Sequence, residues 1–266
     1  MDTSSRKLIF LTASLGAYLL MCATIPAQSL NRPTPLQQRI EVQRQRLSSS
    51  NSEERRDALM QLGAMKHPEA SRAATSALND PDPVVRLTAA HAIATLPAAE
   101  AANALMPLLK DKQEVVRREA AFALGATHSG SAVQPLIDLL ATDKDAGVRA
   151  AAALALGRIG DEAAVVPLAE ILSGSSLSKK KSKNKNNEFV LRTAAQALGN
   201  IGSRAGVPAL IATLNNEANP IDVRRTAAEA LGKIGDATAM PALKNAVDST
   251  DPYLSQAARN SLRQMH

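Results

Sequence analysis

The segment Val148-Arg149-Ala150-Ala151-Ala152-Ala153-Leu154-Ala155-Leu156-Gly157 returns later in the chain as Val223-Arg224-Arg225-Thr226-Ala227-Ala228-Glu229-Ala230-Leu231-Gly232. Related copies open at Glu54, Val85, Val116, Val190 and Leu254, so that successive copies are separated by 31, 31, 32, 42, 33 and 31 residues. A nearly constant period of this length is typical of a solenoid of stacked helix pairs. The longer spacing before Val190 indicates an insertion in one repeat.

The apolar residues of each copy fall on one side of a helix. The opening aliphatic residue and the residues four, seven and eight positions after it form one stripe, as Val85, Ala89, Ala92 and Ile93 do. In the clearest copies the stripe runs into Leu-Gly-x-Ile-Gly, and we expect the second glycine to end the helix with a left-handed cap. A shorter helix with an early proline should follow each turn. These segments begin at Pro135, Pro167, Pro208 and Pro241.

The full pattern is Pro-Leu-x-x-x-Leu, an Asp-rich turn, and then Val-Arg-x-x-Ala-Ala-x-Ala-Leu-Gly-x-Ile-Gly. It resembles the short HEAT-like repeats first named from phycobilin lyases, over about residues 52–265. The resemblance implies an all-α fold, a right-handed α-solenoid of about six to seven HEAT-like helix pairs. Such repeats are enzymes in a few branches of the family and protein-binding scaffolds in most.

The arginine after the opening aliphatic residue recurs in several copies. The family likeness suggests that it pairs with a turn carboxylate of a neighbouring repeat, and contact with a ligand is the alternative. Leu191 and Ser255 replace it in two copies. The recurring residues are Arg86, Arg117, Arg149 and Arg224.

The first 29 residues differ from the repeats. Arg6-Lys7 precedes an apolar run over residues 8–25, which Pro26-Ala27-Gln28-Ser29 closes. A basic start, an apolar middle and small residues at the exit are typical of a secretory signal peptide over residues 1–29, with cleavage after Ala27 or Ser29. We therefore expect an exported protein, periplasmic or extracellular, of a bacterial envelope. An uncleaved inner-membrane anchor over residues 8–25 is the alternative.

The chain has one cysteine, Cys22. The residues before it resemble a lipoprotein box, except that Met21 stands where a small residue is expected, so acylation and an ordinary signal-core cysteine both stay open. Removal of the signal leaves no thiol for a disulfide or a metal site. Residues 30–51 are then expected to form a proline-stiffened linker and a polar-faced capping helix, ahead of the repeats at 52–266.

The insertion at residues 173–187 holds five lysines and no acidic residue. Without residues 1–29 the chain has 29 basic and 24 acidic residues, and without the five lysines as well 24 of each remain. The repeats are therefore neutral, and the insertion is predicted to be a disordered, exposed loop. It could contact an anionic membrane or a cell-wall polymer, or it could be a tolerated insertion. Its lysines are Lys179, Lys180, Lys181, Lys183 and Lys185.

No catalytic or cofactor motif is found. The histidines lie in different repeats without metal-ligand spacing, and none is followed by the glutamate of the HEAT-like hydroxylases. They are His67, His91, His128 and His266. No phosphate-binding glycine loop, HExxH pair or nucleophile elbow occurs, and few aromatic residues are present to stack on bases. We therefore expect no enzymatic activity, cofactor, metal or nucleic-acid partner.

The longer helices are expected to line a concave side, with the residues two and six positions after each opening residue pointing into its groove. The N-terminal half of this strip is apolar, around Phe122 and Ala150, and the C-terminal half is polar and basic. An exposed apolar patch marks a partner site more often than chance, and core packing is the alternative. The candidate partner-binding residues are Leu87, His91, Arg118, Phe122, Leu154, Arg192 and Arg225.

Together these features favour an exported, monomeric, non-catalytic scaffold that binds a protein partner on its concave surface. One alternative is a chromophore-handling or chaperone subunit of the phycobilin-lyase type. The other is an envelope adaptor that binds anionic surfaces through the lysines of the insertion.

Overall fold

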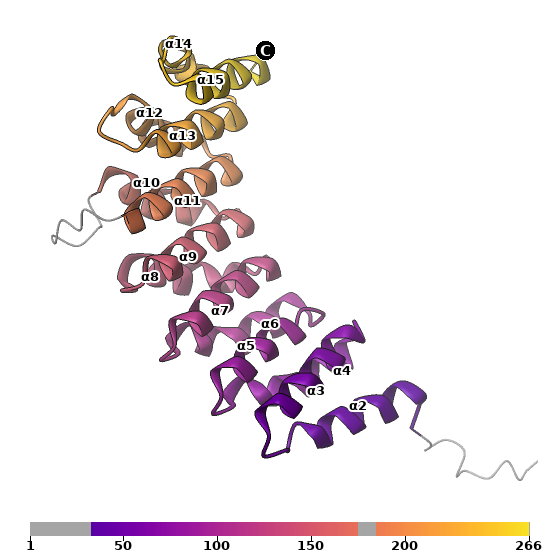
Figure 1. Ribbon diagram of the computed structural model, residues 1–266. Helices are drawn as coiled ribbons and strands as arrows, with labels where there is room; N and C mark the ends of the chain where they lie inside the picture. The colour runs from indigo at the N-terminus through magenta and orange to yellow at the C-terminus, as the bar shows by residue number, and fades with distance from the viewer. Residues whose placement is uncertain (1–32, 175–184, 266) are drawn as a thin grey trace, which may run out of the picture. The chain divides into compact units, whose positions relative to one another are not determined.

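The computed structural model describes residues 33–174 and 185–265, without the side chains of residues 185–187, and its regular structure there is entirely helical (Figure 1). The predicted all-α class is therefore confirmed. Contacts divide the chain between Val42 and Gln43, inside α2 (Pro35–Arg46), so the two parts are described separately. Helix α2 lies within residues 30–51, for which the sequence predicts a linker and a capping helix. The part from Gln43 onward contains all the other helices of the residues that the structure describes.

The helices from Gln43 onward alternate between two kinds, here called first and second helices. The described residues hold six such pairs, and a last first helix follows without a second one, in agreement with the six to seven pairs predicted. The first helices are α3 (Ser52–Ala64), α5 (Pro83–Ala92), α7 (Glu114–Thr127), α9 (Ala146–Ile159), α11 (Lys185–Ile201), α13 (Ile221–Ile234) and α15 (Pro252–Gln264). The second helices are α4 (Pro68–Ala74), α6 (Ala98–Leu105), α8 (Val133–Thr142), α10 (Val165–Ser173), α12 (Val207–Asn215) and α14 (Met240–Val247).

Each first helix packs against the next first helix, and from α5 onward each also packs against the second helix that precedes it (Figure 1). The predicted stripe forms the core, since Val85, Ala89 and Ile93 are at most 1% exposed. The second glycine of Leu-Gly-x-Ile-Gly ends its helix as predicted, with φ of +79° at Gly160 and +72° at Gly235. These left-handed caps allow the chain to turn into the following second helix.

The first glycine of Leu-Gly-x-Ile-Gly has a different role, for which the sequence analysis made no prediction. Gly157 lies inside α9, and a Cβ added to it would lie 2.7 Å from the Cα of Ala197 in α11. The same Cβ at Gly199 would lie 2.8 Å from the Cβ of Ala230 in α13. Successive first helices therefore approach each other backbone to backbone, and only glycine fits at this contact.

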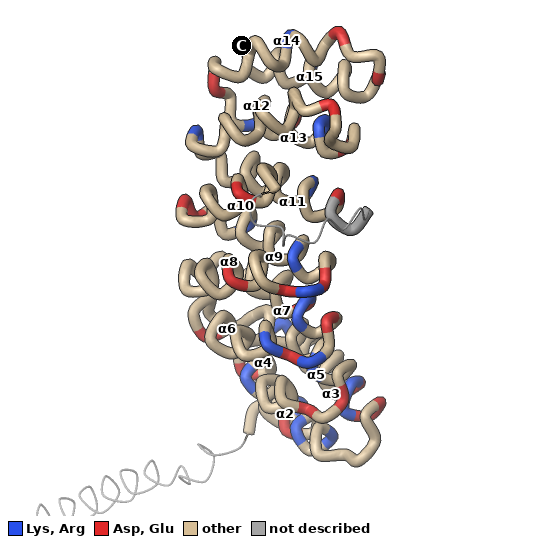
Figure 2. The backbone as a smooth tube through the Cα atoms, turned by 90° about the vertical axis from the view of Figure 1, so that its left-hand side faces the viewer, with Lys and Arg blue, Asp and Glu red and all other residues tan. Residues whose placement is uncertain are grey.

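Three largely buried arginine–aspartate pairs, here called the ladder, link the first four repeats. They lie along the turns before the first helices. Figure 2 shows acidic and basic residues close together there, beside α3, α5, α7 and α9. Each arginine Nε lies 2.7 Å from an aspartate Oδ2 of the next repeat, and these side chains are only 6% to 17% exposed. The Nη2 atom donates to Oδ1 of the same carboxylate. The pairs are Arg55 with Asp80, Arg86 with Asp111, and Arg117 with Asp143.

The carboxylate pairing expected for the recurring arginines is thus confirmed for Arg86 and Arg117 and is wrong for Arg149 and Arg224. The ladder aspartates lie five positions before the next opening residue, and Lys185 and Ser249 occupy that position after these two arginines. Arg224 instead donates through Nε to the backbone carbonyl of Leu214 at 2.9 Å. Without a carboxylate at this position the ladder cannot continue.

The non-helical part of the insertion is shorter than the sequence predicted. The sequence assigned a loop to residues 173–187, but Ser173 ends α10 and α11 already begins at Lys185. The predicted disorder of the remainder, including Lys179, Lys180, Lys181 and Lys183, falls on residues 175–184, outside the described residues. The expected signal peptide or anchor likewise falls outside them. Across residues 33–174 and 185–265, no helix combines the length and the apolar character that a membrane span requires.

Candidate functional site

Helix α5 is shorter than most other first helices: it has 10 residues, whereas α7, α9 and α13 have 14 each. Where the copies that open at Val148, Val190 and Val223 have Gly-x-Ile-Gly, this copy has Ala94-Thr95-Leu96-Pro97. Ala94 adds a methyl group at the position where α9 has the close-approach glycine, and Pro97 replaces the glycine cap. The chain consequently leaves the helix after Ala92, and a groove opens between this end of α5, α6 and α7.

This apolar groove has a volume of about 360 Å³. The half-buried ring of Phe122 contributes the largest side chain of its lining. His91 lies at the rim with its side chain 60% exposed, and its Nε2 is 3.1 Å from Oε1 of Glu119. Arg158 of α9 adds a single cation. The small and aliphatic lining residues are Ala90, Ile93, Ala94, Leu96, Ala98, Ala101, Leu105, Ala123 and Ala126.

The structure brings two of the seven candidate partner-binding residues, His91 and Phe122, into the apolar groove. Arg192 lies in a second groove, described below. Arg225 makes an ion pair with Asp222 at 3.0 Å on its own helix. The candidates outside both groove linings are Leu87, Arg118, Leu154 and Arg225.

The placement of Ala150 at the groove surface is wrong. Ala150 is 0% exposed, as are Ala151, Ala152 and Ala153 around it. Helix α9 packs against α7, α8 and α11, so that its middle is enclosed and the position two after the opening residue is not open there. The predicted apolar strip is therefore interrupted at α9.

Sequence reasoning missed Ala94, Leu96 and Arg158, which line the apolar groove although they lie outside the positions two and six after an opening residue. One signal was present in the sequence. The copy that opens at Val85 is the only one between Glu54 and Val223 that lacks glycine nine positions on, where Ala94 stands. A missing close-approach glycine predicts a wider gap between two first helices.

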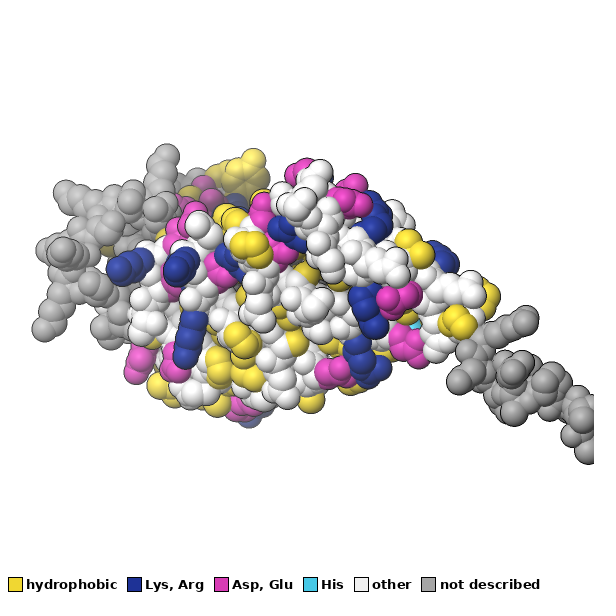
Figure 3. All heavy atoms as spheres, turned by 90° about the horizontal axis from the view of Figure 1, so that it is seen from below, with side chains coloured by type: hydrophobic (Ala, Val, Ile, Leu, Met, Phe, Trp, Pro, Cys, Tyr) yellow, Lys and Arg dark blue, Asp and Glu magenta, His cyan; other side chains and the backbone are white. Residues whose placement is uncertain are grey.

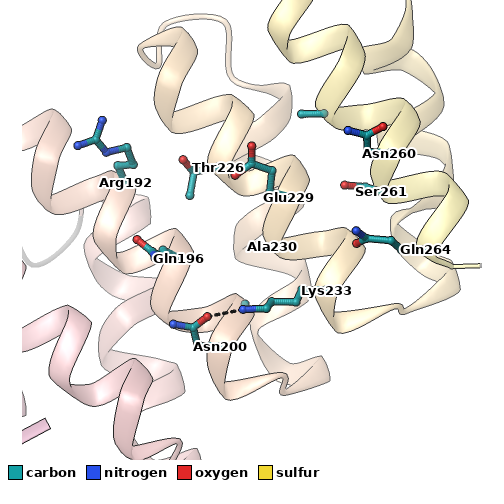
Figure 4. Close-up of a pocket in the computed structure, with 12 residues that line it drawn as sticks. Arg192, Gln196, Asn200, Thr226, Glu229, Ala230, Lys233, Asn260, Ser261 and Gln264 are labelled. Atoms are coloured by element: carbon teal, nitrogen blue, oxygen red, sulfur yellow. Dashed lines mark hydrogen bonds between the residues drawn. The ribbon is translucent and has the colours of Figure 1, made fainter. Parts of the chain in front are cut away.

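A polar groove of about 460 Å³ lies across α11, α13 and α15. Gln196, Glu229 and Asn260 project into it from the three helices, each six positions after its opening residue, as the sequence predicted (Figure 4). Lys233 donates to the Oδ1 of Asn200 at 2.6 Å across two helices. The groove therefore offers amide, carboxylate and ammonium groups, and its lining is more polar than that of the apolar groove.

A third groove, of about 720 Å³, lies among the second-helix segments. Met106, Pro107 and Leu109 line it from one repeat, and Pro135 and Leu139 line it from the next. Its residues were not among the candidates. In contrast to the apolar groove it contains no aromatic side chain.

The described residues contain no group of three or more His, Cys, Asp or Glu side chains that could hold a metal ion. His67 caps α4, where its Nδ1 accepts from the amide of Glu69 at 3.2 Å, and His128 ends α7 in the left-handed conformation. On the face seen in Figure 3, basic side chains lie beside acidic ones instead of forming a patch of one sign.

Comparison with known proteins connects these features to a repeat family. The model of the HEAT repeats family matches residues 40–125, 103–179 and 180–263. Comparison of the sequence with curated proteins found no match.

Solved structures share the arrangement at low identity. YibA of Escherichia coli is 21% identical, with a TM-score of 0.58 over 86% of this chain and 81% of that one. The CpcE–CpcF complex of phycocyanin lyase from Nostoc is 22% identical, with a TM-score of 0.51 over 91% and 98%. Human deoxyhypusine hydroxylase is 21% identical, with a TM-score of 0.41 over 86% and 96%. At these identities the likeness concerns the fold alone.

Proposed function

The chain belongs to the HEAT-repeat family, and we propose that it is a non-catalytic scaffold that binds a protein partner in the apolar groove. The observation that carries this proposal is the half-buried Phe122 in a groove of about 360 Å³. Aromatic side chains in such settings dominate the binding energy of protein interfaces. A small apolar groove with few polar groups matches an apolar side chain better than a charged ligand.

The partner chemistry follows from the composition of the lining. Alanine and leucine side chains around Phe122 favour one large apolar side chain of the partner. Arg158 is the one cation in the lining, and Glu119 faces His91 at the rim. A partner segment with an aliphatic or aromatic anchor and an acidic residue beside it would complement both features.

We expect Phe122→Ala to weaken partner binding by about 1–3 kcal/mol, because truncation of an interface aromatic removes its buried contact area. The loss of folding stability should stay well below the roughly 3–5 kcal/mol of a fully buried phenylalanine, since the ring is half-buried. Phe189→Ala is the matched control, because that ring is 41% exposed and lies outside the apolar groove.

The loss of binding can be measured with a photo-crosslinking residue at position 91, on the groove rim, in cells that make the protein, and the loss of stability by urea unfolding of the purified variants. Discrete adducts that disappear in the Phe122→Ala background and persist with Phe189→Ala support the proposal. The same residue placed at Met60, 58% exposed on α3, should not give these adducts. A large stability loss in Phe122→Ala with unchanged adducts would remove the apolar groove as the binding site.

We also propose that the scaffold is exported, which rests on Arg6-Lys7, the apolar residues 8–25 and the small residues that follow. N-terminal sequencing of the protein from cell fractions should then begin at Gln28 or Leu30, in a fraction outside the cytoplasm. An intact N-terminus in the membrane fraction supports the anchored alternative instead. An intact N-terminus on a cytoplasmic protein would end the export proposal.

A further inference from the structure

The apolar groove and the polar groove lie on the same face of the first helices. Helix α7 lines the apolar groove with the residues three, six, seven and ten positions after Val116, and α13 lines the polar groove with the residues at the same four positions after Val223. Successive first helices pack side by side, so these positions follow one continuous surface from α7 to α15, here called the track. The residues are Glu119, Phe122, Ala123 and Ala126 in α7, and Thr226, Glu229, Ala230 and Lys233 in α13.

Helix α9 carries the part of the track between the apolar groove and α11. Leu154 is half-buried and Arg158 is exposed there, six and ten positions after Val148, so this part of the surface is open to solvent. Arg158 lines the apolar groove, and its side chain has no hydrogen-bond or ion-pair partner among the described residues. Its guanidinium is therefore available to a carboxylate from another molecule.

The polar groove presents side-chain amides whose hydrogen-bonding groups are not used up within the protein. Gln196 on α11 and Gln264 on α15 are exposed, and their side chains make no hydrogen bond in the part of the chain that the structure describes. Asn200 and Asn260 accept hydrogen bonds through Oδ1, and their NH2 groups have no partner there. Figure 4 shows these amides on the open side of the helices.

An extended peptide segment is the ligand that such a lining fits. A side-chain amide offers both a donor and an acceptor, as a peptide group does. An extended segment leaves a backbone N–H and a C=O of each residue to be paired by its surroundings, whereas a helix pairs these groups internally. The lining of the polar groove contains no aromatic side chain on which a sugar ring could stack, so a peptide fits it better than a glycan does.

We propose that one extended segment of the protein partner occupies both grooves. Its apolar anchor lies beside Phe122, an acidic residue pairs with Arg158, and its polar continuation enters the polar groove at Gln196 and Asn200 and reaches Glu229. This inference rests on the proposed function, because it names the form and the length of the partner that the apolar groove binds.

The spacing of the helices sets the length of the segment. Packed helices lie about 8–10 Å apart, and an extended chain advances about 3.3–3.4 Å per residue, so one step from helix to helix takes about three residues. The acidic residue is therefore expected about three residues from the anchor, since α9 lies one step from α7. Helix α13 lies three steps from α7, so the polar continuation must extend about 7–9 residues from the anchor.

Two synthetic peptides test this arrangement. The long probe is acetyl-Leu-Ser-Ser-Asp-Ser-Thr-Ser-Thr-Ser-Thr-amide, and the short probe ends after the aspartate. A long and a short probe with the reversed order of residues cover the opposite chain direction. In NMR titrations both lengths should shift the ring signals of Phe122, and only the long probe, in one of its two directions, should also shift the side-chain amide signals of Gln196 and Asn200. The amide of Asn245, exposed on α14 and outside both groove linings, should not move.

Dissociation constants of the variants separate the two grooves. Gln196→Ala should weaken binding of the long probe about two- to tenfold, the cost of one lost hydrogen bond, and should leave binding of the short probe unchanged. Phe122→Ala should weaken binding of both probes, because both carry the leucine anchor. Asn245→Ala is the matched control, since it also removes an exposed amide from a helix, and it should change neither dissociation constant.

The outcomes distinguish this inference from the proposed function. If the long and short probes bind equally and Gln196→Ala changes neither, while Phe122→Ala weakens both, the apolar groove keeps its role and the segment across both grooves is ruled out. If no probe shifts the Phe122 signals, or Phe122→Ala leaves the binding of both probes unchanged, the proposed function fails and this inference fails with it. Shifts of the Gln196 and Asn200 signals with chitotetraose as large as those with the long probe would assign the polar groove to a glycan and overturn the inference.

Discussion

Asp143→Ala is expected to lower the free energy of unfolding by about 3 kcal/mol, the lower end of the cost of breaking a buried ion pair. The Asp143 carboxylate is 6% exposed and accepts from Nε and Nη2 of Arg117 at 2.7 and 3.0 Å. It also accepts from the amide of Asp145 at 2.9 Å. Alanine would remove three acceptor contacts and leave the 17%-exposed Arg117 without its counter-ion.

Glu100→Ala is the control that isolates burial. Its partner Arg72 also donates through Nε and Nη2, at 2.8 and 2.9 Å. However, the side chain of Glu100 is 40% exposed and that of Arg72 is 51% exposed. Water can replace the lost partner there, so the unfolding midpoint should hardly change. Urea unfolding of both variants gives the comparison. Equal losses would mean that the ladder stabilises the repeats no more than a surface pair does.

The same pair predicts acid sensitivity. Burial raises the pKa of Asp143, but the Arg117 guanidinium and the Asp145 amide outweigh it and hold the pKa below the ordinary value of an aspartate. A carboxyl group with a lowered folded pKa stabilises the protein above its unfolded pKa, and this stability is lost as the pH falls through the folded pKa. The stability difference between wild type and Asp143→Ala should therefore shrink as the pH falls below about 4. A constant difference down to pH 2 would contradict this.

The fold could be predicted almost completely because each repeat carries the same local signals. The stripe that begins at Val85, the prolines of the second helices and the caps such as Gly160 each act within a few residues, and each was found where expected. Arg55 was missed as a ladder member because its copy opens with Glu54 in place of an aliphatic residue. Its pairing with Asp80 depends on the position of the arginine and not on the residue before it.

The candidate site was predicted only in part because its shape depends on contacts between repeats. His91 and Phe122 were placed by their position on a helical face, which the sequence contains. The apolar groove around these two residues arises because α5 ends at Ala92. The consensus pattern of the repeats does not show this early end, because it occurs in one copy only. Ala150 occupies the same repeat position as Leu87 and Arg118 but is enclosed, since neighbouring helices approach α9 closely.

Gly157→Ala should destabilise the solenoid by about 3 kcal/mol, the upper end of the cost of overpacking a well-packed core. The added Cβ would lie 2.7 Å from the Cα and 2.8 Å from the Cβ of Ala197, and neither atom can rotate away. Helices α9 and α11 would have to separate, which exposes the core between the two repeats.

Gly63→Ala is the matched control, because Gly63 occupies the same position of the repeat in α3. There the added Cβ would meet the Cα of Ala92 at 3.4 Å, an ordinary contact. Alanine favours a helix over glycine by up to about 1 kcal/mol, so this variant should be unchanged or slightly more stable than wild type. Thermal and urea unfolding of the two variants should thus give changes of opposite sign or widely different size. Similar losses in both would show that close approach of the backbones is not what requires glycine at this position.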